Sequence, residues 1–467
     1  SVVLPHAEIA VFRKDWSKES DYMLFRFFSL PIPSNREMFH NDNLAFEYYT
    51  KGDLLLPDSG EIKYYIRDPN RLGYGGYGAV DSKGHNVLQI NNGNGKVGGA
   101  TKGSASYANF DNPAYLKDYL ISNFFEFVEA EMHWTKIEDR SPEPSPSNGW
   151  YWFGGNKITL DDPVTWRRSI LYPDKEYFAI LDYLVGNQAR EIDTLFHLGS
   201  FNITATKYND SNATPGHVHG TLFIENKKID WLNQTFGDEI IYGQANLIKW
   251  GTVSKYTGKP VELYLYSAPK SELTVEKFWA RIGGYDKYNE IDHPLIRFKL
   301  YNTSKMHRIT VLYAIHPDEE QPPTFDETTT NDYTLVHVNT GTYDDYIASG
   351  DNIAHSTLTT DGDYVFLRTQ SDSLMMFFIR DGSYLKYNNE IQIQVSKKVA
   401  HIALKKEGEK RTICINGTGS VTITLYNLNP DLEYRVKRDG VVYTNWEMSG
   451  SNMTIYTDLS EHTFEIE

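Results

Sequence analysis

The chain has 467 residues, of which 62 are acidic and 46 basic, and its formal net charge is −16 at pH 7. This excess of negative charge disfavours nucleic acids and anionic membranes as general partners, because both bind basic surfaces. Cys414 is the only cysteine, which excludes an internal disulfide framework, and no run of 18 apolar residues could form a membrane-spanning helix. The length predicts more than one domain, and the aromatic fraction of 14% is typical of half-buried strands and of surfaces that stack on sugars.

The first 30 residues predict a pair of β-strands. HAEIAVFRKDW and DYMLFRFFSL both alternate apolar and polar residues, and the polar segment SKES separates them. An alternation with a period of two residues indicates strands that have one buried face.

Residues 38–92 contain the tightest set of metal-type ligands in the chain. His40, Asp58 and His85 each adjoin a β-type run, namely AFEYY, DLLL and VLQI. Two imidazoles and one carboxylate suit Zn²⁺ and leave one tetrahedral position for water or another ligand. The alternative is that these are three unrelated polar residues at strand ends, since no CxxC or HExxH pattern is present.

The segments after Asp58 are predicted to be turns and loops, followed by a short helix. GYGGYG places the phenols of Tyr74 and Tyr77 shortly before His85, and a sharp turn that packs aromatic rings would account for them structurally. Residues 93–110 are rich in Gly and Ser, which predicts a loop, and the lack of a GK[ST] pair excludes a phosphate-binding P-loop. We predict a short helix over NPAYLKDYLISN, residues 112–123, and a strand over FFEFVEAEMHW.

Two adjacent arginines precede a strand that carries an aspartate. Arg167 and Arg168 lie in TWRRSILYP, and Asp182 lies in the following segment EYFAILDYL. One interpretation is structural, with either arginine paired to Asp182 inside a sandwich. The other is recognition of a substrate carboxylate, for which the bidentate geometry of arginine is well suited.

A pair of histidines follows in TPGHVHGTLFI. His217 and His219 are two residues apart, so on a strand both rings project from the same face. Such a pair can bind a second metal, transfer protons or contact substrate. It can equally be an ordinary pair at the edge of a loop.

The remaining sequence predicts strands throughout. Segments such as VELYLYSA, LIRFKLYN and LMMFFIRD alternate with polar turns, and from residue 408 the strands become short and are separated by NP, RDG and SGSN turns. We therefore predict an all-β fold, with a large antiparallel β-sandwich (a supersandwich) over residues 1–407 and a small C-terminal β-sandwich over residues 408–467.

The segment around the predicted metal site resembles the central β-domain of the heparinase II/III-like polysaccharide lyases. In that family a His precedes a strand, a Leu-Leu-x-Asp-x-Gly strand follows, and a His-Asn strand completes a structural zinc site. The matching positions are His40, Asp58 within GDLLLPDSG, and His85 within HNVLQINN. The sequence departs from the pattern at Met38, where heparinase-type members carry a catalytic His, and a thioether cannot transfer protons.

The resemblance implies β-elimination on a uronic-acid polysaccharide. The family's first β-strands follow an N-terminal helical toroid that carries most catalytic residues and is missing from this sequence. We expect it on a removed or separate segment. One catalytic side chain of the family comes from the β-domain, and Tyr74 and Tyr77 are the nearest phenols for that role. The stretch TWRRSILYPDKEYFAILDYLVG also resembles the family's segment in which Arg-Arg-Ser precedes a strand that bears an Asp. We take Arg167, Arg168, His217 and His219 as the candidate substrate-binding residues.

Two hypotheses of function therefore stand side by side, with a third from another class. The first is the β-portion of a secreted, zinc-containing polysaccharide lyase that binds or cleaves acidic polysaccharide. The second is a non-catalytic secreted glycoprotein scaffold that binds sugars or self-assembles. Met38 and the missing toroid favour the second. An unrelated β-glycosidase would need two carboxylates at a defined separation, which sequence alone cannot show.

Extracellular placement follows from an excess of N-glycosylation sequons. Ser1 is not an initiator methionine, so we expect the chain to be processed. Several strand-rich segments must also cover their edges or pair with another chain, which predicts a possible homo-oligomer. The sequons, which predict glycosylated surface loops, begin at Asn202, Asn209, Asn212, Asn233, Asn302, Asn416 and Asn452.

Overall fold

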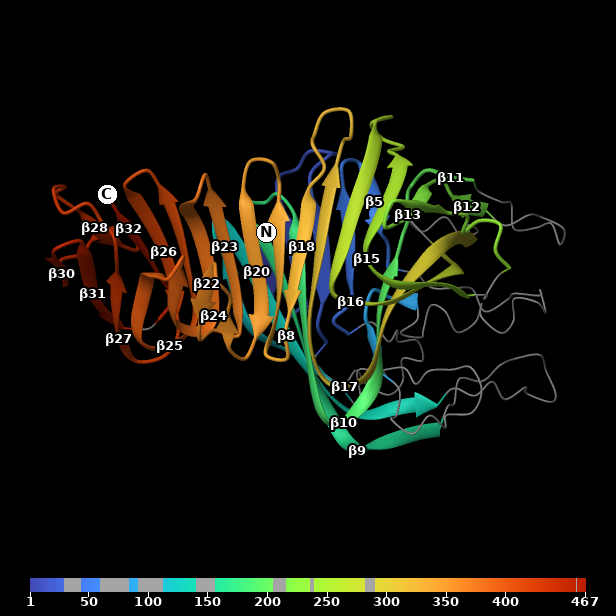
Figure 1. Ribbon diagram of the computed structural model, residues 1–467, viewed down its shortest axis with the longest axis horizontal. Coiled ribbons are helices and arrows are strands. Elements are labelled where there is room, and N and C mark those ends of the chain that lie inside the picture. The colour runs from blue at the N-terminus through green and yellow to red at the C-terminus, as the bar shows by residue number, and fades with distance from the viewer. Residues whose placement is uncertain are drawn as a thin grey trace. The chain divides into compact units, whose positions relative to one another are not determined.

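The protein is an all-β molecule, as predicted. The computed structural model describes residues 1–28, 43–58, 84–90, 112–139, 156–204, 216–235, 239–281, 290–458 and 460–467. Every regular element within these ranges is a β-strand, and the strands form sheets of 5, 12 and 15 strands (Figure 1).

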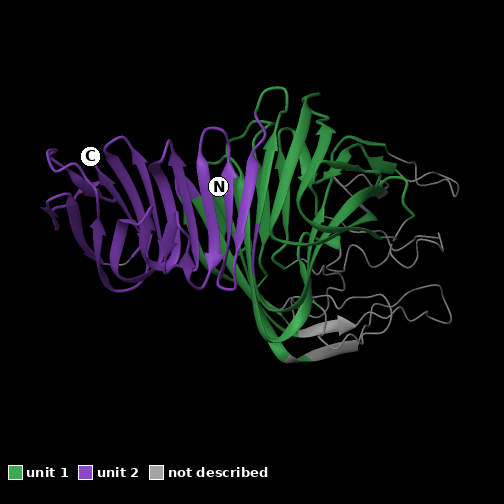
Figure 2. Cartoon of the chain, in the orientation of Figure 1, with its two compact units in different colours: residues 1–121, 126–306, 310–320 green, residues 122–125, 307–309, 321–467 purple. Residues whose placement is uncertain are grey.

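The chain divides into two compact units, drawn in green and purple in Figure 2. Unit 1 comprises residues 1–121, 126–306 and 310–320, and unit 2 comprises residues 122–125, 307–309 and 321–467. The predicted boundary between residues 407 and 408 falls inside unit 2. There Glu407 pairs with Lys410 across a hairpin, so the terminal strands extend an existing sheet.

The five-stranded sheet of unit 1 is formed by consecutive antiparallel strands. Its second and third strands, joined through the pair Phe12↔Met23, confirm the two strands predicted in the first 30 residues. Along both strands the buried and half-buried residues alternate, which gives the sheet one core face. The strands are β1 (Val2–Leu4), β2 (Ile9–Arg13), β3 (Tyr22–Arg26), β4 (Phe46–Thr50) and β5 (Asp53–Leu56).

The second sheet of unit 1 has twelve strands and is mostly antiparallel. Its main path runs β14-β13-β15-β16-β17-β10-β9-β8-β7, and the short strand β12 pairs in parallel with β17. The strands are β6 (Leu88–Ile90), β7 (Ala114–Ile121), β8 (Phe125–Asp139), β9 (Asn156–Pro173), β10 (Phe178–His197), β11 (Ile203–Thr204), β12 (Gly216–Val218), β13 (Thr221–Ile224), β14 (Lys227–Ile229), β15 (Glu239–Val253), β16 (Pro260–Arg281) and β17 (Glu290–Ile315).

The core of unit 1 lies between these two sheets. Phe12 of β2 meets the ring of Phe178 of β10 edge-on, with 5.7 Å between centroids, and Phe46 of β4 lies 6.3 Å from Phe196 of β10. These residues belong to one continuous buried cluster drawn from both sheets. Unit 1 is therefore a sandwich whose stability comes mainly from buried apolar and aromatic surface.

The segment predicted as a short helix is strand β7. Ala114 pairs with Met132 and Ile121 with Glu126 of β8, with an irregularity between Leu116 and Asp118. Ala114 and Leu120 are buried, whereas Tyr115 and Tyr119 are exposed. The helix prediction was wrong because pairing along β8 and burial of alternate residues outweigh the helical preference of Ala, Leu and Lys.

Unit 2 is built from one fifteen-stranded sheet that folds into two layers. The main path runs β18-β19-β20-β23-β24-β25-β26-β32-β28-β29, and the pair β21-β22 and the set β27-β31-β30 branch from β24 and β25. The strands are β18 (Thr324–Thr329), β19 (Tyr333–Asn339), β20 (Asp344–Gly350), β21 (Ile353–Ala354), β22 (Leu358–Thr360), β23 (Tyr364–Gln370), β24 (Ser373–Tyr387), β25 (Glu390–Glu407), β26 (Lys410–Asn416), β27 (Ser420–Leu425), β28 (Val436–Arg438), β29 (Val441–Val442), β30 (Trp446–Ser449), β31 (Asn452–Asp458) and β32 (His462–Ile466).

The hairpin of β24 and β25 joins the two layers of unit 2. The first part of β24 pairs with β23 and its last residues pair with β22, with a register shift at Gly382. A Cβ at Gly382 would lie 2.9 Å from Gly362 Cα, so the strand can bend here only because the residue has no side chain. A single apolar cluster lies between the layers.

Candidate functional site

The structure brings together two of the three predicted metal ligands. Asp58 follows β5 by two residues, and His85 precedes β6 by three. His85 Nδ1 contacts Asp58 Oδ1, and the His85 ring is fully buried. Arg26 of β3 donates from Nη1 to Asp58 Oδ2 at 3.0 Å. The pair therefore lies where the end of β5, the start of β6 and the end of β3 meet.

Asn86 positions this pair by tying its own segment to three others. Its Nδ2 donates to the carbonyl oxygens of Phe46 at 2.9 Å and Pro57 at 3.0 Å. Its Oδ1 accepts from the backbone N–H of His197 at 2.8 Å. A fully buried amide with these three bonds fixes where His85 can point. Sequence analysis missed this role, although an amide between a histidine and the apolar run VLQI was a signal of a buried polar contact.

Arg168 lies behind Asn86 and pairs with Asp182. Its Nε and Nη2 donate to the two carboxylate oxygens of Asp182 at 2.8 and 2.9 Å, and its Nη1 donates to the carbonyls of Leu44 and Asn86 at 2.8 and 2.7 Å. Both ionic side chains are fully buried. For Arg168 the structure therefore favours the structural pairing with Asp182 over recognition of a substrate carboxylate, because a guanidinium held in this way is not accessible to a substrate.

Arg167 alternates with Arg168 and takes different partners. It donates from Nε and Nη2 to Glu131 Oε2 at 3.2 and 3.1 Å, and its side chain is 20% exposed. Lys117 and His133 also approach Glu131, at 3.2 and 3.3 Å. Arg167 is thus part of a partly exposed ionic cluster, where a saccharide carboxylate could compete with Glu131.

A second carboxyl group, that of Glu47, lies near Asp58. Burial, followed by the negative charge of Asp58, raises the pKa of Glu47, and Arg26 opposes this shift. Glu47 lies opposite Leu24 on the neighbouring strand, two residues before Arg26. One guanidinium therefore faces two carboxyl groups, so an added cation would relieve their repulsion.

The donor set fits zinc as far as the structure describes it. An imidazole nitrogen and a carboxylate oxygen, both fixed by strand ends, are ligand types that Zn²⁺ takes in proteins. Across the described ranges, no group of three or more His, Cys, Asp or Glu residues is placed to hold a metal ion. The predicted third ligand His40 lies outside the described residues, as do Met38, Tyr74 and Tyr77.

His217 and His219 lie on one face, as their spacing predicts. Their ring centroids are 4.9 Å apart, and His219 Nε2 lies 2.8 Å from Thr204 Oγ1. Burial, and then the neighbouring His219, lower the pKa of His217, whereas Asp292 opposes this shift. The neutral form of His217 is therefore favoured, which suits a hydrogen-bonding or proton-accepting role.

A second histidine pair is fully buried beside Asn86. His197 Nδ1 lies 2.8 Å from His293 Nε2, and His293 Nδ1 lies 3.2 Å from the carbonyl of Ile291. A carbonyl only accepts, so His293 Nδ1 carries a proton and His293 Nε2 accepts from His197. Burial lowers the pKa of His293 to about 4. Sequence analysis did not single out this pair.

The predicted glycosylation sites differ in exposure. Asn233 and Asn302 are exposed, whereas Asn202, Asn416 and Asn452 are half-buried. Asn209 and Asn212 lie outside the described residues. In the part of the chain that the structure describes, no helix is long and apolar enough to cross a membrane.

Structural comparison places the chain beside polysaccharide lyases of low sequence identity. A heparinase III gene product is 14% identical, with a TM-score of 0.43 over 79% of this chain and 42% of that chain. Another heparinase III structure is 16% identical, with a TM-score of 0.43 over 74% and 41%. Heparan sulfate lyase HepC from Pedobacter heparinus is 13% identical, with a TM-score of 0.41 over 71% and 39%. The chain therefore spans less than half the length of these proteins.

The family assignment comes from the sequence. No curated protein matches it significantly. Residues 1–262, more than half of the 467-residue chain, match the family described as heparinase II/III-like, C-terminal. The matched range includes Asp58 and His85, the two described residues of the predicted metal site, and the Arg168–Asp182 pair. The chain belongs to the heparinase II/III-like family, and its β-sandwich is of polysaccharide-lyase ancestry.

Proposed function

We propose that this chain is the β-portion of an extracellular polysaccharide lyase that binds zinc and a uronic-acid-containing polysaccharide. The observation that carries the proposal is the contact of His85 with Asp58, held in place by Asn86 within the matched region. His40, Asp58 and His85 would hold the zinc, which would cross-link the segments that end β5 and begin β6. The chemistry that zinc supplies here is structural, because it replaces a network of weak contacts with strong ligand bonds.

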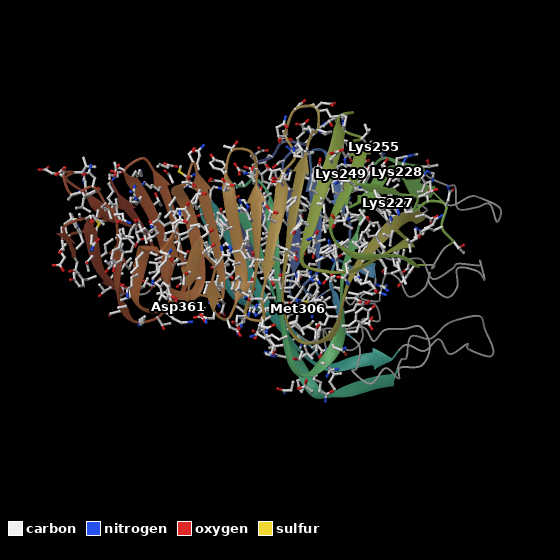
Figure 3. The ribbon with its side chains drawn as sticks, viewed as in Figure 1. Lys227, Lys228, Lys249, Lys255, Met306 and Asp361 are labelled. Carbon is white, nitrogen blue, oxygen red and sulfur yellow. The ribbon has the colours of Figure 1, made fainter. Side chains whose placement is uncertain are left out.

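A local basic surface supports binding of an acidic saccharide by a protein whose net charge is −16. Lys228 of β14 and Lys249 of β15 both pair with Phe223 of β13, so they lie in one row about 10 Å apart across three strands. Lys249 Nζ is 4.7 Å from the ring of Phe223 and 3.2 Å from Glu262 Oε1, a carboxylate that a saccharide carboxylate would have to displace. Lys227 and Lys255 come from the same part of unit 1 (Figure 3). An apolar ring between two cations suits a sugar chain with repeated carboxylates.

Elimination on a uronate needs three functions: neutralisation of its carboxylate, removal of the C5 proton and protonation of O4. Arg167, His217 and His219 are the described residues that we assign to contact with the saccharide. Tyr74 and Tyr77 remain the proposed phenols for proton transfer. We assign the other catalytic groups to a helical part of the protein that works with this chain.

Binding and cleavage are tested together on acidic polysaccharides. We expect the chain to bind alginate, heparan sulfate and hyaluronan in affinity gels, and to bind carboxyl-reduced alginate much less. Lys228→Gln combined with Lys249→Gln should weaken binding about tenfold and flatten its salt dependence, because two cationic contacts are lost. Lys397→Gln combined with Lys398→Gln in unit 2 is the charge-matched control.

The absorbance at 235 nm tests whether this chain catalyses elimination by itself. We expect no rise from the chain alone, because the helical groups supply most of the elimination chemistry. A rise would place the whole reaction in this chain and make Tyr74→Phe and Tyr77→Phe the next variants. Failure to bind any uronate polymer would contradict the proposal. It would favour the non-catalytic secreted glycoprotein scaffold, to which Met38 already points.

A further inference from the structure

A groove of about 480 Å³ lies on unit 2, on the outer face of β25, β27 and β31. Thr422 pairs with Tyr456 and Ser420 pairs with Asp458, so these four side chains share one face of the sheet. Val421 alternates with them and is buried in the core. The groove volume falls within the range of about 300–1,000 Å³ typical of small-molecule sites.

Of the two tyrosines that line this groove, Tyr443 and Tyr456, the second is held in a fixed position. Tyr456 is 38% exposed, and its hydroxyl donates to Glu447 Oε1 at 2.5 Å. The carbonyl oxygen of Tyr456 accepts from Asn445 Nδ2 at 3.0 Å and from the hydroxyl of Tyr443. The segment between β29 and β30 is therefore tied to β31 and walls one side of the groove. A fixed ring and wall lose little conformational freedom when a ligand binds.

The charge of the groove favours a neutral ligand. Hydrogen bonds from His462 and Ser460 hold the pKa of Asp458 down at about 2, and Arg438 Nη1 donates to its Oδ1 at 2.9 Å. Asp458 is thus an ionised acceptor whose charge Arg438 offsets. Among the described residues that line the groove there is no lysine or arginine. The groove therefore offers no excess of positive charge to a polymer of uronates or sulfates.

The remaining lining groups are the donors and acceptors that sugar hydroxyls need. Ser396, Ser420 and Thr422 contribute hydroxyls, and Asn445 contributes an amide. An exposed aromatic ring beside such groups offers an apolar face for the C–H face of a sugar and partners for its hydroxyls. These groups suit the binding of a sugar.

We propose that this groove binds a neutral polysaccharide, with a sugar ring stacked on Tyr456 and its hydroxyls bonded to Thr422, Ser420 and Asp458. The site is separate from the proposed acidic-saccharide surface and differs from it in charge. It would hold unit 2 on an uncharged glycan whether or not the chain takes part in elimination.

Affinity electrophoresis of the whole chain tests this site with four soluble neutral polymers: hydroxyethyl cellulose, mixed-linkage β-glucan, dextran and amylose. We expect at least one polymer to retard the chain. Tyr456→Ala should weaken that binding at least tenfold, whereas Tyr456→Phe, which keeps the ring, should stay within a few-fold of the original. Tyr256→Ala, which removes an exposed tyrosine from unit 1, is the matched control. Circular dichroism checks that each variant is folded.

Two results would overturn the proposal: retardation by none of the four polymers, or equal retardation of the Tyr456→Ala variant. A parallel gel with alginate separates this site from the proposed function. Loss of neutral-polymer binding with unchanged alginate binding supports two sites. Loss of both in Tyr456→Ala would show that a single site serves both ligands and would contradict the assignment.

Discussion

The Arg168→Met variant is expected to lose about 3–5 kcal/mol of the free energy of unfolding, because it leaves the buried carboxylate of Asp182 without its cation. Asp182 would keep the hydrogen bond from Trp166 Nε1, at 2.8 Å, but no charge to balance it. The carbonyls of Leu44 and Asn86 would lose their donor as well. Urea denaturation measures the loss.

The neighbouring arginine provides the control. Arg167→Met removes a cation of the same type from the adjacent position, but Arg167 is itself partly exposed and Glu131 keeps Lys117 at 3.2 Å, so the expected loss is smaller, below about 2 kcal/mol. The double variant Arg168→Met with Asp182→Leu should lose less than the sum of the two single changes, because no buried charge is left unpaired. Equal losses for Arg167→Met and Arg168→Met would contradict the structural role of Arg168.

Stability is expected to fall as the pH is lowered from about 6.5 to about 4, with His293 contributing about 3 kcal/mol. The pKa of His293 is near 6.5 in the unfolded chain and about 4 in the fold, so between these values the unfolded chain binds more protons. Above pH 6.5 both forms are neutral, and the contribution is fully present. Protonation of Nε2 would also remove the acceptor for His197.

The slope of the unfolding free energy against pH separates the protonation of His293 from a simple loss of packing. Between pH 6.5 and 4, His293→Gln should reduce the number of protons taken up on unfolding by about one, and so make stability fall less steeply with pH. This holds whatever the substitution does to stability at neutral pH. His6→Gln, at an exposed position near the first strands, should leave the slope unchanged. An unaltered slope in His293→Gln would contradict the assignment of that proton.

The strands were predictable where one face of a sheet is buried. Residues 22–26 alternate in sequence, and the structure buries Met23 and Phe25 while leaving their neighbours half-exposed. Residues 112–123 lacked a comparable signal, because their composition suits a helix and only the partner strand β8 decides the outcome. Local patterns therefore predict strands well where they have a solvent face, and poorly where pairing decides.

The pairing that supports the candidate site could be predicted only in part. Asp58 and His85 were selected by motif, and the structure brings them together across 27 positions of sequence. The structural interpretation of Arg168 named Asp182 correctly, since the two residues face each other across the hairpin of β9 and β10. The bonds from Arg168 to Leu44 and Asn86 span 124 and 82 positions, and no local pattern encodes such contacts.

The domain boundary at residue 408 was predicted from short strands separated by turn motifs. Such motifs show only where the chain turns. Short strands already occur from β18 to β23, before residue 408, and β26 pairs with β25 along seven residues and shares the apolar core of unit 2. Turn spacing describes how often a chain reverses. It carries no information about whether the new strands join an existing sheet.

The zinc content of the purified chain tests the central claim most directly. We predict about one zinc per chain by elemental analysis, lost in Asp58→Asn, in His85→Gln and in His40→Gln, and kept in His217→Gln. Chelation should lower the melting temperature of the original chain and leave the three zinc-free variants unchanged, because metal binding stabilises only the folded state. A chain without zinc, or zinc that survives the Asp58 and His85 substitutions, would contradict the assignment of this site.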